Sequence, residues 1–167
     1  MVYNVMRAIC IYHSETGNTH AVMEEIVQSI AAESIRVRDT AGYGKATMYL
    51  LGAPRALLGT RAEIEPSSFD LKGYDLVIFG SPVWASRPTP AVNAIVSGLK
   101  NEAGKKVVLV CTSGGSPGDT LQIMEERVRS LGMEVIGRFH IAHTVKGGRD
   151  EEEIHALKGA LWDIARS

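Results

Sequence analysis

Short apolar runs alternate along the chain with longer segments that have the periodicity of amphipathic helices. The apolar runs lie at 6–12, 35–39, 75–80, 106–112 and 133–141. Helical patterns follow most of them, as in 18–32, where apolar side chains recur every three or four residues. Such β-α units predict an α/β fold, in which helices cover both faces of a parallel sheet. A length of 167 residues suits a single domain, 1–167, with a sizeable core.

The composition of the strands indicates their order in the sheet. The first, third and fourth runs are apolar on both faces, which is typical of central strands. The second run, IRVRD, alternates apolar residues with Arg36 and Arg38, and the fifth is interrupted by Glu134 and Arg138. Both patterns favour a position at an edge of the sheet. We therefore predict a doubly wound, five-stranded parallel sheet with the order 2-1-3-4-5.

Three polar loops, rich in Gly, Ser and Pro, follow the central strands. They lie at 14–19, 81–86 and 112–119. In a sheet of the predicted order, ligands bind beyond the carboxyl ends of the strands, where the strand order reverses. All three loops are expected at that crevice.

The first of these loops, SETGNT, joins a strand to a helix and contains no Lys or Arg. A helix N-terminus offers unpaired amides and a partial positive charge, and Gly17 lets the backbone approach a ligand closely. The loop fits neither GxxxxGK[ST] nor GxGxxG, which disfavours a magnesium-bound nucleoside triphosphate. Ser, Thr, Asn and Gly are also ordinary capping and turn residues. The loop alone therefore leaves a phosphate site and a plain helix cap equally open.

All three loops resemble those of the flavodoxins and flavodoxin-like FMN proteins. S-E-T-G-N-T is similar to the family's phosphate loop, G-S-P-V-W at 80–84 to the loop that places an aromatic ring on the flavin, and T-S-G-G at 112–115 to the second loop beside the flavin. With the strand order, the resemblance covers nearly the whole chain except 40–66.

The resemblance implies FMN as cofactor, with its isoalloxazine between the second and third loops and Trp84 stacked on it. The implied cofactor-binding residues are Ser14, Glu15, Thr16, Gly17, Asn18, Thr19, Ser81, Pro82, Val83, Trp84, Ala85, Thr112, Ser113, Gly114 and Gly115. No catalytic acid or base and no metal ligand is implied, because the flavin itself carries the chemistry.

Some features depart from the family pattern. Flavodoxins that stabilise the one-electron reduced flavin often have Gly after the aromatic residue, whereas this chain has Ala85. A positive φ at this position would cost Ala about 1 kcal/mol more than Gly. The third loop has no aromatic residue, so Tyr43, Tyr49 or a substrate would have to cover the second flavin face. The net charge is only -1, whereas flavodoxins are typically acidic.

Three functions follow from these observations. The leading hypothesis is an FMN-binding, flavodoxin-like protein that transfers electrons to and from redox partner proteins. The alternative is an FMN-dependent NAD(P)H:quinone-type oxidoreductase, which takes hydride from a nicotinamide cofactor to a small acceptor. The third is a non-redox module whose first loop holds another phosphate compound, and Trp84 argues against it.

Composition narrows the setting in which the protein works. The near-zero net charge gives no indication of nucleic acid or an anionic membrane as partner. We find neither an apolar run long enough to span a membrane nor a signal peptide, so a cytoplasmic location is expected. Cys10 and Cys111 lie in apolar runs, on strands too far apart for a disulfide, and are interpreted as buried thiols.

The remaining motifs favour no other chemistry. Residues 114–118 fit GxSxG, but the residue after the serine is Pro117, which has no N–H for an oxyanion hole. His140 and His143 are expected on opposite sides of a strand, and His13 and His20 as partly exposed turn residues. Segment 40–66 is apolar and interrupted by Gly and Pro; a helix in two pieces, a lid and a homodimer contact remain open for it.

Overall fold

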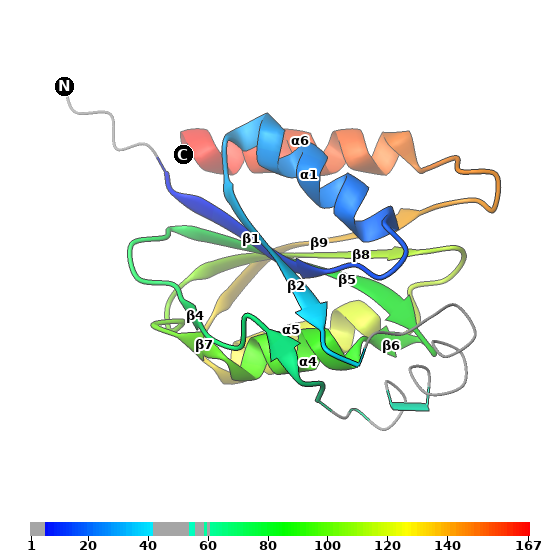
Figure 1. Cartoon of the computed structure of the whole chain (residues 1–167). Coiled ribbons are helices and arrows are strands. Elements are labelled where there is room, and N and C mark those ends of the chain that lie inside the picture. Colours follow the sequence, from blue (N-terminus) through cyan, green and yellow to red (C-terminus); the bar gives the residue numbers. More distant parts are fainter. Residues whose placement is uncertain (1–5, 42–53, 56–58, 60) are drawn as a thin grey trace.

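The computed structural model describes residues 6–41, 54–55, 59 and 61–167. Its centre is a parallel sheet with the strand order β2-β1-β5-β8-β9 (Figure 1). These strands are β1 (Ala8–His13), β2 (Glu33–Asp39), β5 (Leu76–Trp84), β8 (Lys106–Ser113) and β9 (Glu134–Ala142). The predicted order 2-1-3-4-5 is therefore confirmed. Tyr43, Tyr49 and most of segment 40–66 lie outside the described residues.

Short strands extend this sheet beyond the five that were predicted. β3 (Ile64–Glu65) pairs antiparallel with β2, and β6 (Arg87–Pro88) pairs antiparallel with β5, giving a seven-stranded sheet. β4 (Phe69–Asp70) and β7 (Leu99–Lys100) form a separate parallel pair. A strand of two residues is too short to show the alternation by which strands are found in a sequence.

Helices cover both faces of the sheet, as the alternation of strands and helices predicts. α1 (Asn18–Ile30) and α6 (Glu151–Arg166) lie on one face, and α4 (Pro90–Ser97) and α5 (Thr120–Ser130) on the other (Figure 1). The side chains of β1 show how the two cores form, because successive residues point to opposite faces. Ile9 and Ile11 belong to the apolar cluster under α4 and α5, and Cys10 and Tyr12 to the cluster under α1 and α6.

Two helices begin with a side-chain cap at their N-terminus. Pro90 is the first residue of α4, and the side chain of Thr89 caps that helix by accepting from the amide of Val92. The side chain of Asp150 caps α6 by accepting from the amide of Glu153, 3.0 Å away.

Both cysteines are buried and unpaired. Cys10 lies on β1 and Cys111 on β8, with β5 between these strands. Burial raises the pKa of each thiol to about 12. The thiols therefore stay protonated at neutral pH and act as small apolar side chains of the core.

Candidate functional site

Contacts between side chains and backbone bring the three predicted loops together at the carboxyl edge of the sheet. The hydroxyls of Thr19 and Thr112, both buried, lie 2.8 Å apart and join the first loop to the third. The amide of Asp119 donates to the carbonyl of Ser86 at 2.8 Å and joins the third loop to the second. Immediately before the first loop, the ring of His13 at the end of β1 lies edge-on to the Trp84 ring of the second loop. The predicted convergence is thus observed.

The first loop leaves the N-terminus of α1 without a cap. Gly17 precedes the helix with φ +95° and has no side chain that could cap it; of the first three amides of α1, only that of His20 has a side-chain acceptor within the described part of the chain, the hydroxyl of Ser14. The amides of Asn18 and Thr19 have no partner among the described residues, and the first turn contains no acidic residue. A Cβ added at Gly17 would meet no atom within 4 Å. Backbone donors, the helix dipole and open space beside Gly17 together fit a phosphate group.

The side chains of this loop divide into two groups. Thr16 and Asn18 are exposed, and the side-chain amide of Asn18 donates to the hydroxyl of Thr16 at 3.4 Å. The hydroxyl of Ser14 accepts from the amide of His20 at 3.0 Å, and Thr19 points inward to the third loop. Of the hydroxyl and amide donors predicted in 14–19, Thr16 and Asn18 therefore face solvent, whereas Ser14 and Thr19 hold the loop in shape.

A cation reaches this loop from another strand. Arg36 of β2 donates from Nη2 to the carbonyl of Ser14 at 2.9 Å. Sequence reasoning missed this contact because it looked for Lys or Arg within 14–19. The parallel register, which sets Tyr12 of β1 opposite Arg36, brings the two segments together.

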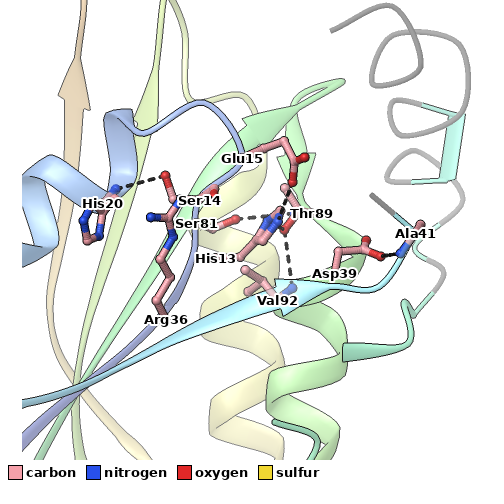
Figure 2. Close-up of polar contacts among 10 residues, drawn as sticks. All are labelled: His13, Ser14, Glu15, His20, Arg36, Asp39, Ala41, Ser81, Thr89 and Val92. Carbon is pink, nitrogen blue, oxygen red and sulfur yellow. Dashed lines mark hydrogen bonds and ion pairs between the residues drawn. The ribbon is translucent and has the colours of Figure 1, made fainter. Parts of the chain in front are cut away.

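His13 differs from its prediction as a partly exposed turn residue, because its side chain is only 1% exposed. The ring lies 3.0 Å from the Thr89 hydroxyl through Nδ1 and 3.3 Å from a Glu15 carboxylate oxygen through Nε2 (Figure 2). The Trp84 ring packs edge-on against it, with 5.9 Å between centroids. The alternation of β1 carried the signal, since His13 shares a face with the buried Ile9 and Ile11.

The second loop holds its aromatic residue in the protein interior. Trp84 is only 7% exposed, whereas Pro82 and Val83 before it are partly exposed. Ser81 is buried and donates to the carbonyl of Pro82 at 2.7 Å. Stacking of Trp84 on a flavin stays a prediction; among the described residues its ring partner is His13.

The turn after Trp84 has a left-handed backbone conformation, which is costly for residues other than Gly. Ala85 has φ +49° and Ser86 has φ +63°, in a two-residue turn between β5 and β6. Each left-handed residue other than Gly costs about 1 kcal/mol. Gly118 lies so close that a Cβ on it would overlap Ser86. Contact with the third loop therefore holds this strained turn in place.

The third loop offers two exposed glycines, Gly114 and Gly115, beside a buried Ser113. The Ser113 hydroxyl donates to the carbonyl of Gly115 at 2.9 Å and lies 2.7 Å from Nε2 of His140. Because that hydroxyl has one proton, its bond to Gly115 requires His140 to donate from Nε2. Burial lowers the pKa of His140, which keeps the ring neutral near pH 7 and fits this arrangement.

A fourth segment, after β9, completes the site and was missed by the sequence reasoning. Nε2 of His143 lies 3.4 Å from the side-chain amide nitrogen of Asn18, and the His143 ring faces Gly114. Burial lowers the pKa of His143. A hollow of about 300 Å³ lies here, lined by Asn18, Ala21, Val22, Thr112, Ile141, His143, Gly147 and Arg149. Nothing in the local sequence pattern of 143–149 indicates that it folds back on the first loop.

Comparison with known proteins is informative at the level of structure. No protein-family model and no curated protein matches the sequence. A protein from Bacteroides uniformis ATCC 8492, described as a flavoprotein, matches with 18% identity over 92% of this chain and 98% of that one, at a TM-score of 0.73. A Lactobacillus acidophilus NCFM flavoprotein in complex with FMN matches with 24% identity over 81% and 93%, at a TM-score of 0.64. The two-electron reduced flavodoxin of Megasphaera elsdenii matches with 20% identity over 96% and 99%, at a TM-score of 0.58.

The chain has a flavodoxin-like fold. The similarity extends over nearly the full length of each of these three proteins. The fold that the resemblance implies is therefore confirmed. In this flavodoxin-like fold, none of the described helices is both long and apolar enough to cross a membrane.

Proposed function

We propose that the chain binds FMN and transfers electrons. The observation that carries the proposal is the uncapped N-terminus of α1 beside Gly17, where two unpaired amides meet open space. The three loops converge at this point, where the strand order reverses. The structural neighbours include an FMN complex and a flavodoxin, which supports the same ligand.

Each loop has a separate role in this proposal. The amides of Asn18 and Thr19 bind the phosphate, and the side chains of Thr16 and Asn18 add donors at the exposed rim. Pro82–Ala85 and Thr112–Gly115 flank the isoalloxazine, and the exposed glycines of the third loop let its backbone approach the ring. Bound FMN supplies a group that accepts and releases one or two electrons. The protein orients it and limits its contact with water.

Titration of the FMN-free protein with FMN, followed by quenching of flavin fluorescence, tests the binding. We expect saturable binding of one FMN per chain. A protein that leaves flavin fluorescence unchanged, and is stabilised by some other phosphate compound, would contradict the proposal and favour a non-redox module.

The alternative, an FMN-dependent reductase that uses NADH or NADPH, has one structural observation in its favour. Gly114 and Gly115 are exposed and 112–119 contains no aromatic residue, which leaves room for a substrate on one flavin face. Visible spectra during stepwise anaerobic reduction separate the two functions. Reduction in two one-electron stages indicates an electron carrier with protein partners. Reduction in a single two-electron stage, with turnover of NADH or NADPH by a small acceptor, indicates the reductase.

A further inference from the structure

A second and larger cavity lies on the other side of the first loop, at the carboxyl ends of β1 and β2. Its volume is about 520 Å³, and it is lined by His13, Ser14, Glu15, Arg36, Val37, Arg38, Asp39 and Glu65. Among the described residues, none lines both this cavity and the 300 Å³ hollow beside the third loop. A cavity of this size accommodates a small organic ligand.

Asp39 is a residue of this cavity with an unsatisfied hydrogen-bond acceptor. It is the last residue of β2, and its side chain is only 5% exposed. One carboxylate oxygen, Oδ1, accepts from the amide of Ala41 at 2.8 Å (Figure 2). The other, Oδ2, is buried and has no hydrogen-bond partner within the described part of the chain. A buried acceptor without a donor is costly, so a ligand that donates to it would bind favourably.

The cationic groups of the cavity are already engaged. Arg38 pairs with Glu65 at 2.7 Å on the exposed rim, and Arg36 donates to the carbonyl of Ser14. The ring of His13 contacts Glu15 through only one carboxylate oxygen, Oε2. Acceptors on Asp39 and Glu15 therefore remain available to a ligand that donates hydrogen bonds.

The position of Asp39 in the fold identifies the kind of hydroxyl. It ends the second strand of a β-α-β unit whose first strand is followed by a glycine-containing loop. In dinucleotide-binding folds, an acidic residue about twenty positions after such a loop accepts hydrogen bonds from ribose hydroxyls. The loop 14–19 does not fit GxGxxG, and the N-terminus of α1 is assigned to the FMN phosphate, so only this ribose contact is carried over to the present cavity. We propose that this cavity binds the ribose of a nucleotide, with Asp39 accepting from its vicinal hydroxyls. The site goes beyond the proposed function and does not depend on FMN.

Calorimetric titration of the FMN-loaded and the FMN-free protein with AMP and with 2′-deoxy-AMP tests the proposal. We expect AMP to bind both forms, and at least about tenfold more tightly than 2′-deoxy-AMP, because the deoxy ligand leaves Asp39 without its donor. Equal affinities for the two ligands, or no binding of AMP, would overturn the proposal. Displacement of AMP by FMN would also overturn it, because the cavity would then be part of the FMN site.

Asp39→Asn supplies the matching variant, since its amide oxygen still accepts from the amide of Ala41 while the second oxygen is replaced. We expect it to lose the preference for AMP over 2′-deoxy-AMP and to keep its FMN affinity. Asp163→Asn, which changes an exposed carboxylate on α6, is the control and should bind AMP as the unaltered protein does. Retention of the preference by Asp39→Asn would contradict the assignment.

The same samples separate this inference from the proposed function. FMN binding is measured by flavin fluorescence and AMP binding by heat. Failure of AMP alone overturns the nucleotide site, and failure of FMN alone overturns the proposed flavin function. Circular dichroism of Asp39→Asn checks that the variant is folded.

Discussion

α1 and α6 lie side by side on one face of the sheet, yet their N-termini are built in opposite ways (Figure 1). α6 begins with a side-chain cap from Asp150 and three glutamates in its first turn. α1 follows Gly17, which has no side chain to cap it, and its first turn contains no acidic residue. The chain thus neutralises the positive end of α6 with its own side chains, and leaves that of α1 available to an external anion.

The comparison shows how a stabilising helix end differs from a binding one. A missing cap costs about 1 kcal/mol of stability. At α6 the Asp150 side chain satisfies an amide of the first turn, whereas at α1 the first two amides lack a partner among the described residues and lie where three loops converge. The uncapped end is located where a bound phosphate would recover the lost interactions.

The largest expected effect comes from giving α1 an acidic residue. Gly17→Asp would place a carboxylate in the open space beside the amides of Asn18 and Thr19, where it competes with the phosphate and repels it. We expect FMN affinity to fall on the order of a hundredfold, corresponding to about 2.7 kcal/mol. Fluorescence titration with FMN measures the change.

Gly104→Asp is the matched control for this substitution. Gly104 also has a positive φ, +77°, and a Cβ added there would likewise meet no atom within 4 Å. The backbone strain is therefore similar, but the position lies before β8, at the amino end of that strand. Loss of FMN affinity in both variants to the same extent would show that strain, and not the charge at α1, causes it.

Removing the cap of α6 should affect stability without affecting binding. Asp150→Ala deletes the acceptor for the amide of Glu153, and we expect the free energy of unfolding to fall by about 1 kcal/mol. Urea denaturation measures it. Asp150→Asn keeps an acceptor and should restore most of the loss. A decrease in FMN affinity with either variant would contradict the division between the two helix ends.

A smaller effect is expected from pH, through the histidine beside α1. Burial lowers the pKa of His143 below its ordinary 6.5, so the unfolded chain takes up a proton at a higher pH than the folded one. The neutral, buried His143 therefore contributes its full share to the unfolding free energy above pH 6.5. This contribution is lost as the pH falls below that value, because the unfolded chain then binds more protons than the folded one. In His143→Gln, the unfolding free energy of the FMN-free protein should fall less steeply between pH 7 and pH 5. An unchanged slope in urea denaturation would contradict this.

The sequence predicts the strand order of the sheet because strand composition distinguishes central strands from edge strands. Strands that are apolar on both faces must be buried in the middle of the sheet, which leaves the other two for the edges. It predicts the meeting of the three loops because that follows from the order alone. The prediction of His13 as partly exposed was wrong although His13 follows the alternation of β1, with Ile11 on the same face. That prediction followed residue type, since His is seldom fully buried, and not position in the strand. Asp39 was assigned no environment from the sequence, although it shares a face of β2 with the buried Val37. The approach of His143 to Asn18 depends on how a loop folds back, for which periodicity gives no signal.

The smallest effect separates the charge of α6 from its hydrogen-bonded cap. Glu152 is exposed in the first turn of α6, and Glu152→Gln removes its charge with little change in shape. We expect a loss of about 0.3 kcal/mol, because the carboxylate interacts with the helix dipole across solvent. The loss should disappear in 1 M salt, where charges are screened within about 3 Å. A loss that persists at high salt in urea denaturation would mean that Glu152 stabilises α6 through a contact and not through its charge, and the contrast with α1 would then depend on the Asp150 cap alone.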